Sequence, residues 1–419
     1  MDFKTLFKIS LICILLIFSL CSCSFADDID DEFVNVNAEI TDNVNSDISN
    51  LSLPNDINSR AYVVIDRNSN TILCGKNESE KRKMASTTKI LTATVILENC
   101  NLNDTIEVSK KAAGTGGSRL CLKTGDKITV HDLLYGLMLR SGNDCAVALA
   151  EYAGGSIEGF AELMNKKANE LGLKNSRFET PHGLDSSEHY TTAYELAVLT
   201  NYALRNKTFS TIVGTKSYTI TLNGEPVTIN NTNELLGVFD GVYGVKTGFT
   251  NGANRCLVTA CKRNDLDVIC VVLGADTKKF RTSDSIKLLN FVFNNFEPVN
   301  LQEKIGSYFE DWKSKNKIFV NKGQVDFCSI SAEPLDCAVV PLPKNSKDNL
   351  SCLITCNDSF EAPVMESTLI GTIELKLNDK TITTTNIYTN KSVPRKSLFN
   401  YFFTFFKNFP YYLEEGLSN

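Results

Sequence analysis

Three short polar motifs constrain this chain more strongly than any other feature. They are Ser86-Thr87-Thr88-Lys89, Ser141-Gly142-Asn143 and Lys246-Thr247-Gly248. The first residues of successive motifs stand 55 and then 105 residues apart, so only a folded chain can bring them together. Each motif alone occurs by chance in many proteins, whereas the three in this order are specific. We therefore expect them to form one site.

The first motif has the chemistry of an activated nucleophile. A serine hydroxyl is a weak nucleophile at neutral pH and must lose its proton to a base as it attacks. Lys89 follows Ser86 by three residues, so on a helix the two side chains share one face. The apolar run Ile90–Leu97 predicts that this helix is buried, with Ser86 at its N-terminal end. Burial and the nearby positive charge of Lys246 would favour the neutral amine of Lys89, which could then act as the base.

The second and third motifs supply further groups that such a site needs. Ser141 could relay a proton between Lys89 and the leaving group, while Asn143 could hold a substrate amide. A second interpretation treats the first motif as a helix cap and the third as a turn. It does not explain why all three motifs occur together. The pattern therefore favours nucleophilic catalysis by Ser86.

The N-terminus has the pattern of a secretory signal peptide, which we predict over residues 1–26. Lys4 and Lys8 precede the apolar run Ile9–Leu20, and small residues follow at the expected cleavage site. The run is too short to span a membrane comfortably. An alternative is lipid attachment at Cys23, because the preceding residues loosely resemble a lipoprotein processing site. The pattern predicts export.

Composition separates the next segment from the rest of the chain. Residues 27–54 are rich in Asp and Asn and contain no Lys or Arg, which predicts a disordered acidic spacer. The chain of 419 residues carries a net charge of −6 without a basic block, which argues against a nucleic-acid partner. Its length allows two domains with substantial cores.

Residues 55–297 mix strand and helix patterns and predict an α+β domain with helices around an antiparallel sheet. Apolar β-type runs predict strands at 61–66, 71–74, 242–246, 256–262 and 267–273. Apolar residues at helical spacing predict helices at 129–140, 145–152, 156–171 and 283–296. Thr129 and Asp132 have the spacing of a capping box. Residues 141–144 are expected in a loop between two helices.

The sequence changes character after the α+β segment. Short β-type runs such as Leu369–Leu375 and Thr381–Thr385, separated by Pro and Asn clusters, predict a small β-sandwich domain over 298–390. In the tail, 391–419, the very aromatic segment Leu398–Phe409 leaves only a narrow polar stripe on a helix surface. This pattern predicts an amphipathic anchor at a membrane surface. A helix docked onto the protein itself is the alternative.

Further segments resemble the serine-type D-alanyl-D-alanine carboxypeptidases, the low-molecular-mass penicillin-binding proteins. The resemblance covers about residues 55–390. Beyond the three motifs it rests on Leu134–Leu139, Thr180-Pro181-His182-Gly183-Leu184, Thr192–Ala197 and Gly244–Thr250. It implies a β-lactamase/transpeptidase-like catalytic domain, then a β-rich domain and a membrane-anchoring tail. One departure is Arg255, at a position where relatives more often carry an aromatic residue.

The resemblance also assigns roles to single residues. It implies that Ser86 is the acylated nucleophile, Lys89 its base, and Ser141 and Asn143 the proton relay and the substrate-positioning amide. The implied substrate-binding residues are Lys246, Thr247, Gly248, Phe249 and Arg281. The backbone N–H groups of Ser86 and Phe249 would form the oxyanion hole. For Arg281 an ordinary surface salt bridge is the alternative.

The implied reaction removes the terminal D-alanine from peptidoglycan pentapeptide stems, outside the cytoplasmic membrane or in the cell wall. β-Lactams would acylate Ser86 as inhibitors, and neither a metal nor an organic cofactor is required. Two alternatives are a β-lactamase and a non-catalytic penicillin-binding sensor. A third is a Ser-His-Asp hydrolase using His182 and Asp185, although no G-x-S-x-G elbow surrounds a serine.

Overall fold

The computed structural model describes residues 53–399 and 402. The chain divides into two compact units between Asn294 and Asn295. The predicted signal peptide, with Cys23, most of the predicted spacer and most of the tail lie outside the described residues. Among the helices that the structure describes, none is both long and apolar enough to cross a membrane.

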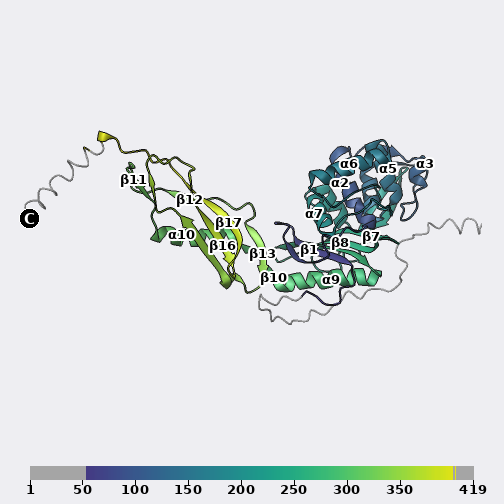
Figure 1. Ribbon diagram of the computed structural model, residues 1–419. Coiled ribbons are helices and arrows are strands. Elements are labelled where there is room, and N and C mark those ends of the chain that lie inside the picture. The colour runs from purple at the N-terminus through teal and green to yellow at the C-terminus, as the bar shows by residue number, and fades with distance from the viewer. Residues whose placement is uncertain (1–52, 400–401, 403–419) are drawn as a thin grey trace, which may run out of the picture. The chain divides into compact units, whose positions relative to one another are not determined.

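A five-stranded antiparallel sheet lies at the centre of the first unit (Figure 1). Its strands follow the order β2-β1-β9-β8-β7, so β7 forms one edge. Their bounds are β1 (Ala61–Asp66), β2 (Ile72–Lys76), β7 (Val242–Thr250), β8 (Asn254–Arg263) and β9 (Leu266–Ala275). Every strand that the sequence predicts for this region is present, and the α+β prediction is confirmed.

Helices cover both faces of this sheet. The long helix α9 (Lys278–Asn295) lies along one face, and the other helices cluster on the opposite face (Figure 1). The cluster contains η2 (Ala85–Thr88), α2 (Lys89–Asn99), α3 (Lys110–Ala113), α4 (Val130–Leu139), α5 (Asn143–Gly154), α6 (Ile157–Glu170), α7 (Ala193–Ala203) and α8 (Lys207–Gly214). Two small hairpins accompany it, β3 (Thr105–Glu107) with β4 (Lys127–Thr129) and β5 (Ser217–Leu222) with β6 (Glu225–Asn230).

The helix α2 runs through the middle of the cluster. All residues from Lys89 to Ile96 are buried, because neighbouring helices cover every side of its first two turns. This explains why its sequence is apolar all round instead of showing a single apolar stripe. Each fully buried Leu or Ile of this kind contributes about 1.5–3 kcal/mol. The core therefore fixes the helix end that carries the first motif.

The second motif departs from its predicted conformation. The helix α4 ends at Leu139, and α5 already begins at Asn143 with Gly142 at its N-cap. Asn143 is therefore the first residue of a helix and does not belong to a loop. The fully buried carboxylate of Asp144 in the first turn supports this start, since it accepts hydrogen bonds from three backbone N–H groups.

The predicted capping box is only half formed. The Thr129 hydroxyl accepts a hydrogen bond from Asp132 N–H at 3.1 Å and caps α4. The Asp132 carboxylate instead accepts from Thr221 N–H at 2.9 Å, on strand β5. The Asp132 carboxylate thus binds a distant strand instead of the Thr129 N–H that a capping box would use.

The second unit is β-rich. A four-stranded antiparallel sheet, in the order β12-β17-β16-β14, shares a core with the helix α10 (Leu301–Lys315), which the sequence analysis does not predict. The sheet strands are β12 (Ile330–Ala332), β14 (Leu350–Cys356), β16 (Leu369–Leu377) and β17 (Lys380–Thr389). Two pairs complete the unit, antiparallel β10 (Phe296–Asn300) with β13 (Val339–Pro343) and parallel β11 (Phe319–Asn321) with β15 (Ser359–Glu361). A short turn of helix, η3 (Lys347–Asn349), precedes β14.

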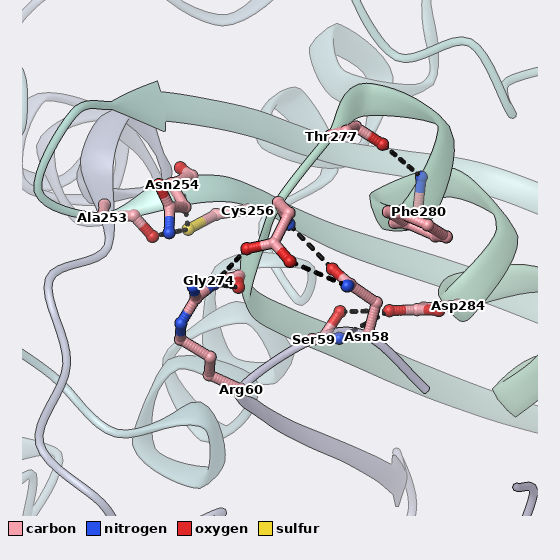
Figure 2. A network of polar contacts seen from close by, with 11 residues as sticks. Asn58, Ser59, Arg60, Ala253, Asn254, Cys256, Gly274, Thr277, Phe280 and Asp284 are labelled. Carbon is pink, nitrogen blue, oxygen red and sulfur yellow. Dashed lines mark hydrogen bonds and ion pairs between the residues drawn. The ribbon is translucent and has the colours of Figure 1, made fainter. Parts of the chain in front are cut away.

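A buried carboxylate ties the segment before β1 to α9. The Ser59 N–H and hydroxyl both donate to Asp284 Oδ2, at 2.7 and 2.6 Å (Figure 2). Asp284 is fully buried. Next to this pair, Asn58 and Arg60 bind the more exposed carboxylate of Asp276. The start of the sheet is thereby held against α9.

Replacing Asp284 with Ala should leave the buried Ser59 N–H without this acceptor. We expect the first unit to lose about 2–3 kcal/mol of unfolding free energy, measured by urea denaturation followed by far-UV circular dichroism. Asp276→Ala is the matched control, because the Asp276 side chain is 50% exposed and its ion pair should contribute under about 1 kcal/mol. Equal losses in the two variants would contradict this account.

Candidate active site

The first and third motifs meet where β7 passes the turn η2. At Gly248 a Cβ atom would lie 3.1 Å from both the Ser86 nitrogen and the Met84 carbonyl oxygen. Such contacts are tighter than side chains usually make, so a glycine is suited to this position. Ser86 itself is only half-buried, whereas Ala85, Thr87 and Thr88 beside it are buried. The hydroxyl is therefore accessible on an otherwise fixed turn.

Lys89 is the centre of the hydrogen-bond network. Its side chain is fully buried, and its Nζ lies 2.9 Å from Ser86 Oγ. The same Nζ lies 2.7 Å from Asn143 Oδ1 and 3.0 Å from the His182 carbonyl oxygen. Ser141 Oγ is at 3.5 Å, the outer limit of a hydrogen bond. The structure thus brings together the four residues for which the sequence predicts catalytic roles.

The amide of Asn143 has a fixed orientation. Its Nδ2 donates to the Gly116 carbonyl oxygen at 2.7 Å, so its Oδ1 must face Lys89. The Asn143 N–H donates to the Ser118 carbonyl oxygen at 2.7 Å. Asn143 therefore also holds the loop around residues 116–118 beside the site.

Backbone strain is present at two positions of the site. Ser141 has a φ of +58° and Ala85 a φ of +50°, a region that residues with a Cβ rarely adopt. Conformations of this kind cost about 1–3 kcal/mol and persist where the surrounding packing enforces them. Both residues are buried. Ser141 lies beside the Lys89 side chain, and Ala85 directly precedes Ser86.

The third motif lies entirely on β7. Lys246 is almost fully buried, and its Nζ donates to the Thr247 carbonyl oxygen at 3.0 Å. Residues two apart on a strand point to the same face, so Lys246 shares the face on which Gly248 meets η2. The Thr247 hydroxyl lies 2.9 Å from the Thr232 hydroxyl.

The unusual Arg255 stacks on the ring of Phe249. Its guanidinium carbon lies 3.7 Å from the ring centroid, and the two residues are register partners in β7 and β8. A cation over an aromatic face contributes about 0.5–2 kcal/mol. Arg255 thereby supports the strand end that follows the third motif.

Arg281 approaches from α9. Its side chain is 1% exposed, and its Nη2 lies 3.7 Å from Glu234 Oε2. Arg281 does form an ion pair, but its side chain is buried and does not lie on the surface as that alternative expected. Arg281 also lies close enough to lower the pKa of Cys256, although burial is the dominant influence and raises that pKa to about 11. Cys256 pairs in register with Gly248 of the third motif.

The alternative Ser-His-Asp arrangement is wrong. The Nδ1 atom of His182 accepts a hydrogen bond from Leu184 N–H at 3.2 Å. The Asp185 carboxylate accepts from the Thr250 hydroxyl and from Gly252 N–H, at 2.8 and 2.9 Å. Because His182 Nδ1 and the Asp185 carboxylate each accept from other groups, the two residues do not form the hydrogen bond that a Ser-His-Asp arrangement needs. In the part of the chain that the structure describes, no group of His, Cys, Asp and Glu side chains is arranged to hold a metal ion.

Sequence reasoning missed a second histidine beside the site. His189 is buried, and its Nε2 lies 2.8 Å from the hydroxyl of Thr88 in the first motif. Burial lowers the pKa of His189 to about 4. Burial is also the main influence on His182 and lowers its pKa to about 3. Both imidazoles are therefore neutral near pH 7.

These two histidines predict an acid-sensitive fold. The folded chain keeps both rings neutral, whereas the unfolded chain protonates them below about pH 6.5, so the unfolded state binds more protons. Stability should therefore fall as the pH falls, by on the order of 3 kcal/mol between pH 7 and pH 5. Urea denaturation at several pH values measures this slope, and His189→Gln should reduce it. A stability that stays constant down to pH 5 would contradict the assignment.

Comparisons with known proteins agree with this geometry. A family model described as D-alanyl-D-alanine carboxypeptidase matches residues 48–277. A second model, for the C-terminal domain of penicillin-binding protein 5, matches residues 307–395.

Individual relatives match both units. D-alanyl-D-alanine carboxypeptidase DacF of Bacillus subtilis is 34% identical over 324 residues, which is 76% of this chain and 81% of the relative. DacC of Escherichia coli is 34% identical over 340 residues, 78% of this chain and 82% of the relative. The crystal structure of penicillin-binding protein 5 from Haemophilus influenzae matches with a TM-score of 0.67 at 27% identity, covering 82% of this chain and all of that one. With its three motifs assembled around Lys89, this chain belongs to the D-alanyl-D-alanine carboxypeptidase family of low-molecular-mass penicillin-binding proteins.

Proposed function

We propose that this chain removes the terminal D-alanine from peptidoglycan pentapeptide stems through an acyl-enzyme on Ser86. The contact that carries the proposal is the 2.9 Å distance between Lys89 Nζ and Ser86 Oγ. It joins a base and a nucleophile next to a strand edge that can align a peptide. The family membership supports the substrate class.

The hydrogen bonds of Lys89 explain how it would act as the base. Two of its partners, Asn143 Oδ1 and the His182 carbonyl oxygen, can only accept. A neutral amine has two N–H groups for these acceptors, which leaves its lone pair for the Ser86 hydroxyl. Ser86 can then lose its proton to Lys89 as it attacks the carbonyl carbon of the D-Ala–D-Ala peptide bond.

The remaining steps would use the other residues of the site. The N–H groups of Ser86 and Phe249 stabilise the oxyanion, and Ser141 passes a proton from Lys89 to the departing amine of D-alanine. Water then hydrolyses the ester on Ser86. β-Lactams acylate Ser86 in the same way, and inhibition by them is typical of this family.

The cationic groups of the site suit the terminal carboxylate of the substrate. Lys246 and Arg281 bring positive charge, and the Thr247 hydroxyl and the close approach at Gly248 shape the same edge of β7. A carboxylate bound there would place the preceding peptide bond at Ser86. This arrangement favours a carboxypeptidase over an endopeptidase.

The two nearest alternatives differ in the fate of the acyl-enzyme. A β-lactamase would hydrolyse the penicilloyl ester rapidly, and a sensor would retain it without releasing D-alanine. The match of the second unit to the C-terminal domain of penicillin-binding protein 5 favours the carboxypeptidase.

D-Alanine release from a diacetyl-Lys-D-Ala-D-Ala peptide tests the reaction. Wild type should release D-alanine, and Ser86→Ala should lower kcat by a factor on the order of 10⁴ or more, because the nucleophile is lost. Ser314→Ala, at an exposed serine of α10, is the matched control and should retain activity. Release that survives in Ser86→Ala would contradict the proposed nucleophile. A folded wild type that releases none would contradict the proposed reaction.

Export and membrane attachment complete the proposal. Residues 1–26 would direct secretion, 27–54 would form a spacer, 55–297 would carry the reaction, and 298–390 would link it to the tail 391–419. The tail would hold the enzyme on the outer face of the cytoplasmic membrane.

A truncation tests the anchor. The mature chain should cosediment with vesicles containing anionic lipid, whereas a chain ending at Ser397 should remain in the supernatant. Binding should weaken but persist at high salt, because apolar burial adds to the electrostatic attraction. Equal sedimentation of both chains would refute an anchoring role of the tail.

A further inference from the structure

The peptide bond between Ala85 and Ser86 carries one of the two proposed oxyanion donors, the Ser86 N–H. This peptide is trans, so its carbonyl and its N–H point in opposite directions. The Ser86 nitrogen faces Gly248, beside the proposed oxyanion position. The group that holds the Ala85 carbonyl on the other side therefore sets the direction of the Ser86 N–H.

The Ala85 carbonyl is held from behind by Thr88. The Thr88 hydroxyl donates to it at 2.8 Å, and the Thr88 side chain is fully buried. Gly183 packs against the same carbonyl so closely that a Cβ atom there would lie 1.9 Å from the oxygen. The positive φ of Ala85 shows that this peptide does not rest in a relaxed conformation. Its orientation therefore depends on these contacts.

His189 fixes the hydroxyl of Thr88 in turn. The Nδ1 atom of His189 accepts a hydrogen bond from Glu179 N–H at 2.9 Å, so the ring proton of the neutral imidazole is on Nε2. The Nε2–H group then donates to Thr88 Oγ1 at 2.8 Å. Because this bond occupies a lone pair of the hydroxyl, the Thr88 proton is directed to the Ala85 oxygen. The edge of the ring also packs against Phe178, with centroids 5.8 Å apart.

We propose that His189 and Thr88 are positioning residues for the oxyanion hole, acting in series through the Ala85 carbonyl on the Ser86 N–H. The inference rests on the acyl-enzyme mechanism proposed above. Aligned hydrogen bonds polarise one another, so the chain from His189 to Ala85 also strengthens the Ser86 N–H as a donor. Neither residue touches the substrate. Their effect appears only when negative charge develops on the substrate oxygen.

Two pairs of variants separate the hydrogen bonds from the packing. Thr88→Val removes the hydroxyl, and Thr88→Ser keeps it. His189→Asn keeps an acceptor near the position of Nδ1 but cannot reach Thr88, whereas His189→Gln places an N–H donor near the position of Nε2. Loss of a whole oxyanion donor lowers kcat about 10²–10³-fold. We expect a misaligned donor, in Thr88→Val and His189→Asn, to lower kcat by roughly 10- to 100-fold with little change in KM.

The conservative variants should restore activity to near the wild-type level. Thr88→Val combined with His189→Asn should be no slower than the slower single variant, because both act on one carbonyl. The affinity of a boronic-acid analogue, which forms a tetrahedral adduct on Ser86, should fall in parallel with kcat. Peptide binding in a Ser86→Ala background should not change. A loss that followed thermal stability in all four variants would indicate packing alone and overturn the inference.

The outcomes distinguish this inference from the proposed function. Acylation by penicillin can be measured without peptide turnover. A wild type that is acylated but releases no D-alanine would overturn only the carboxypeptidase proposal. Wild-type acylation rates in folded Thr88→Val and His189→Asn would overturn only the role of His189 and Thr88.

Discussion

The burial of Lys89 is the constraint on which the rest of the site depends. A lysine side chain without access to water is costly unless its nitrogen is hydrogen-bonded. Here the partners come from η2, from α5 and from the segment before Gly183. Each partner belongs to a different part of the chain. If any of them moved, the amine would lose a hydrogen bond while it remained buried. The same contacts that make the burial tolerable therefore align the Lys89 amine with the Ser86 hydroxyl.

This arrangement requires unusually close backbone approaches. Gly248 lets β7 reach the Ser86 nitrogen, and Gly183 lets its own segment reach the Ala85 carbonyl. Ala85 and Ser141 accept a left-handed backbone in the same region. Such strain persists because α2 is packed on all sides and cannot shift to relieve it. The large apolar core of the first unit thus holds the polar atoms of the site in their positions.

Sequence reasoning succeeded where the determining contact is local or carried by a motif. The pairing of Ser86 with Lys89 follows from their spacing of three residues, and strand β7 follows from its apolar residues. It failed for His189, because Thr88 is 101 residues away and its other partner is a backbone N–H that any residue could supply. It failed for the start of α5, because the carboxylate that stabilises it is satisfied by a distant loop. The stacking of Arg255 on Phe249 likewise required the register of two strands.

The charge distribution of the site argues for an anionic substrate. Lys246 and Arg281 are each 1% exposed, and Lys89 is fully buried. If Lys89 were also charged, three cations would stand in one poorly solvated region, so a neutral amine reduces the repulsion and is also the form that a base requires. Lys246 and Arg281 would suit the terminal carboxylate of the proposed substrate. In the proposed reaction a bound carboxylate would add its negative charge to this region, where the carboxylate of Glu234 already lies 3.7 Å from Arg281.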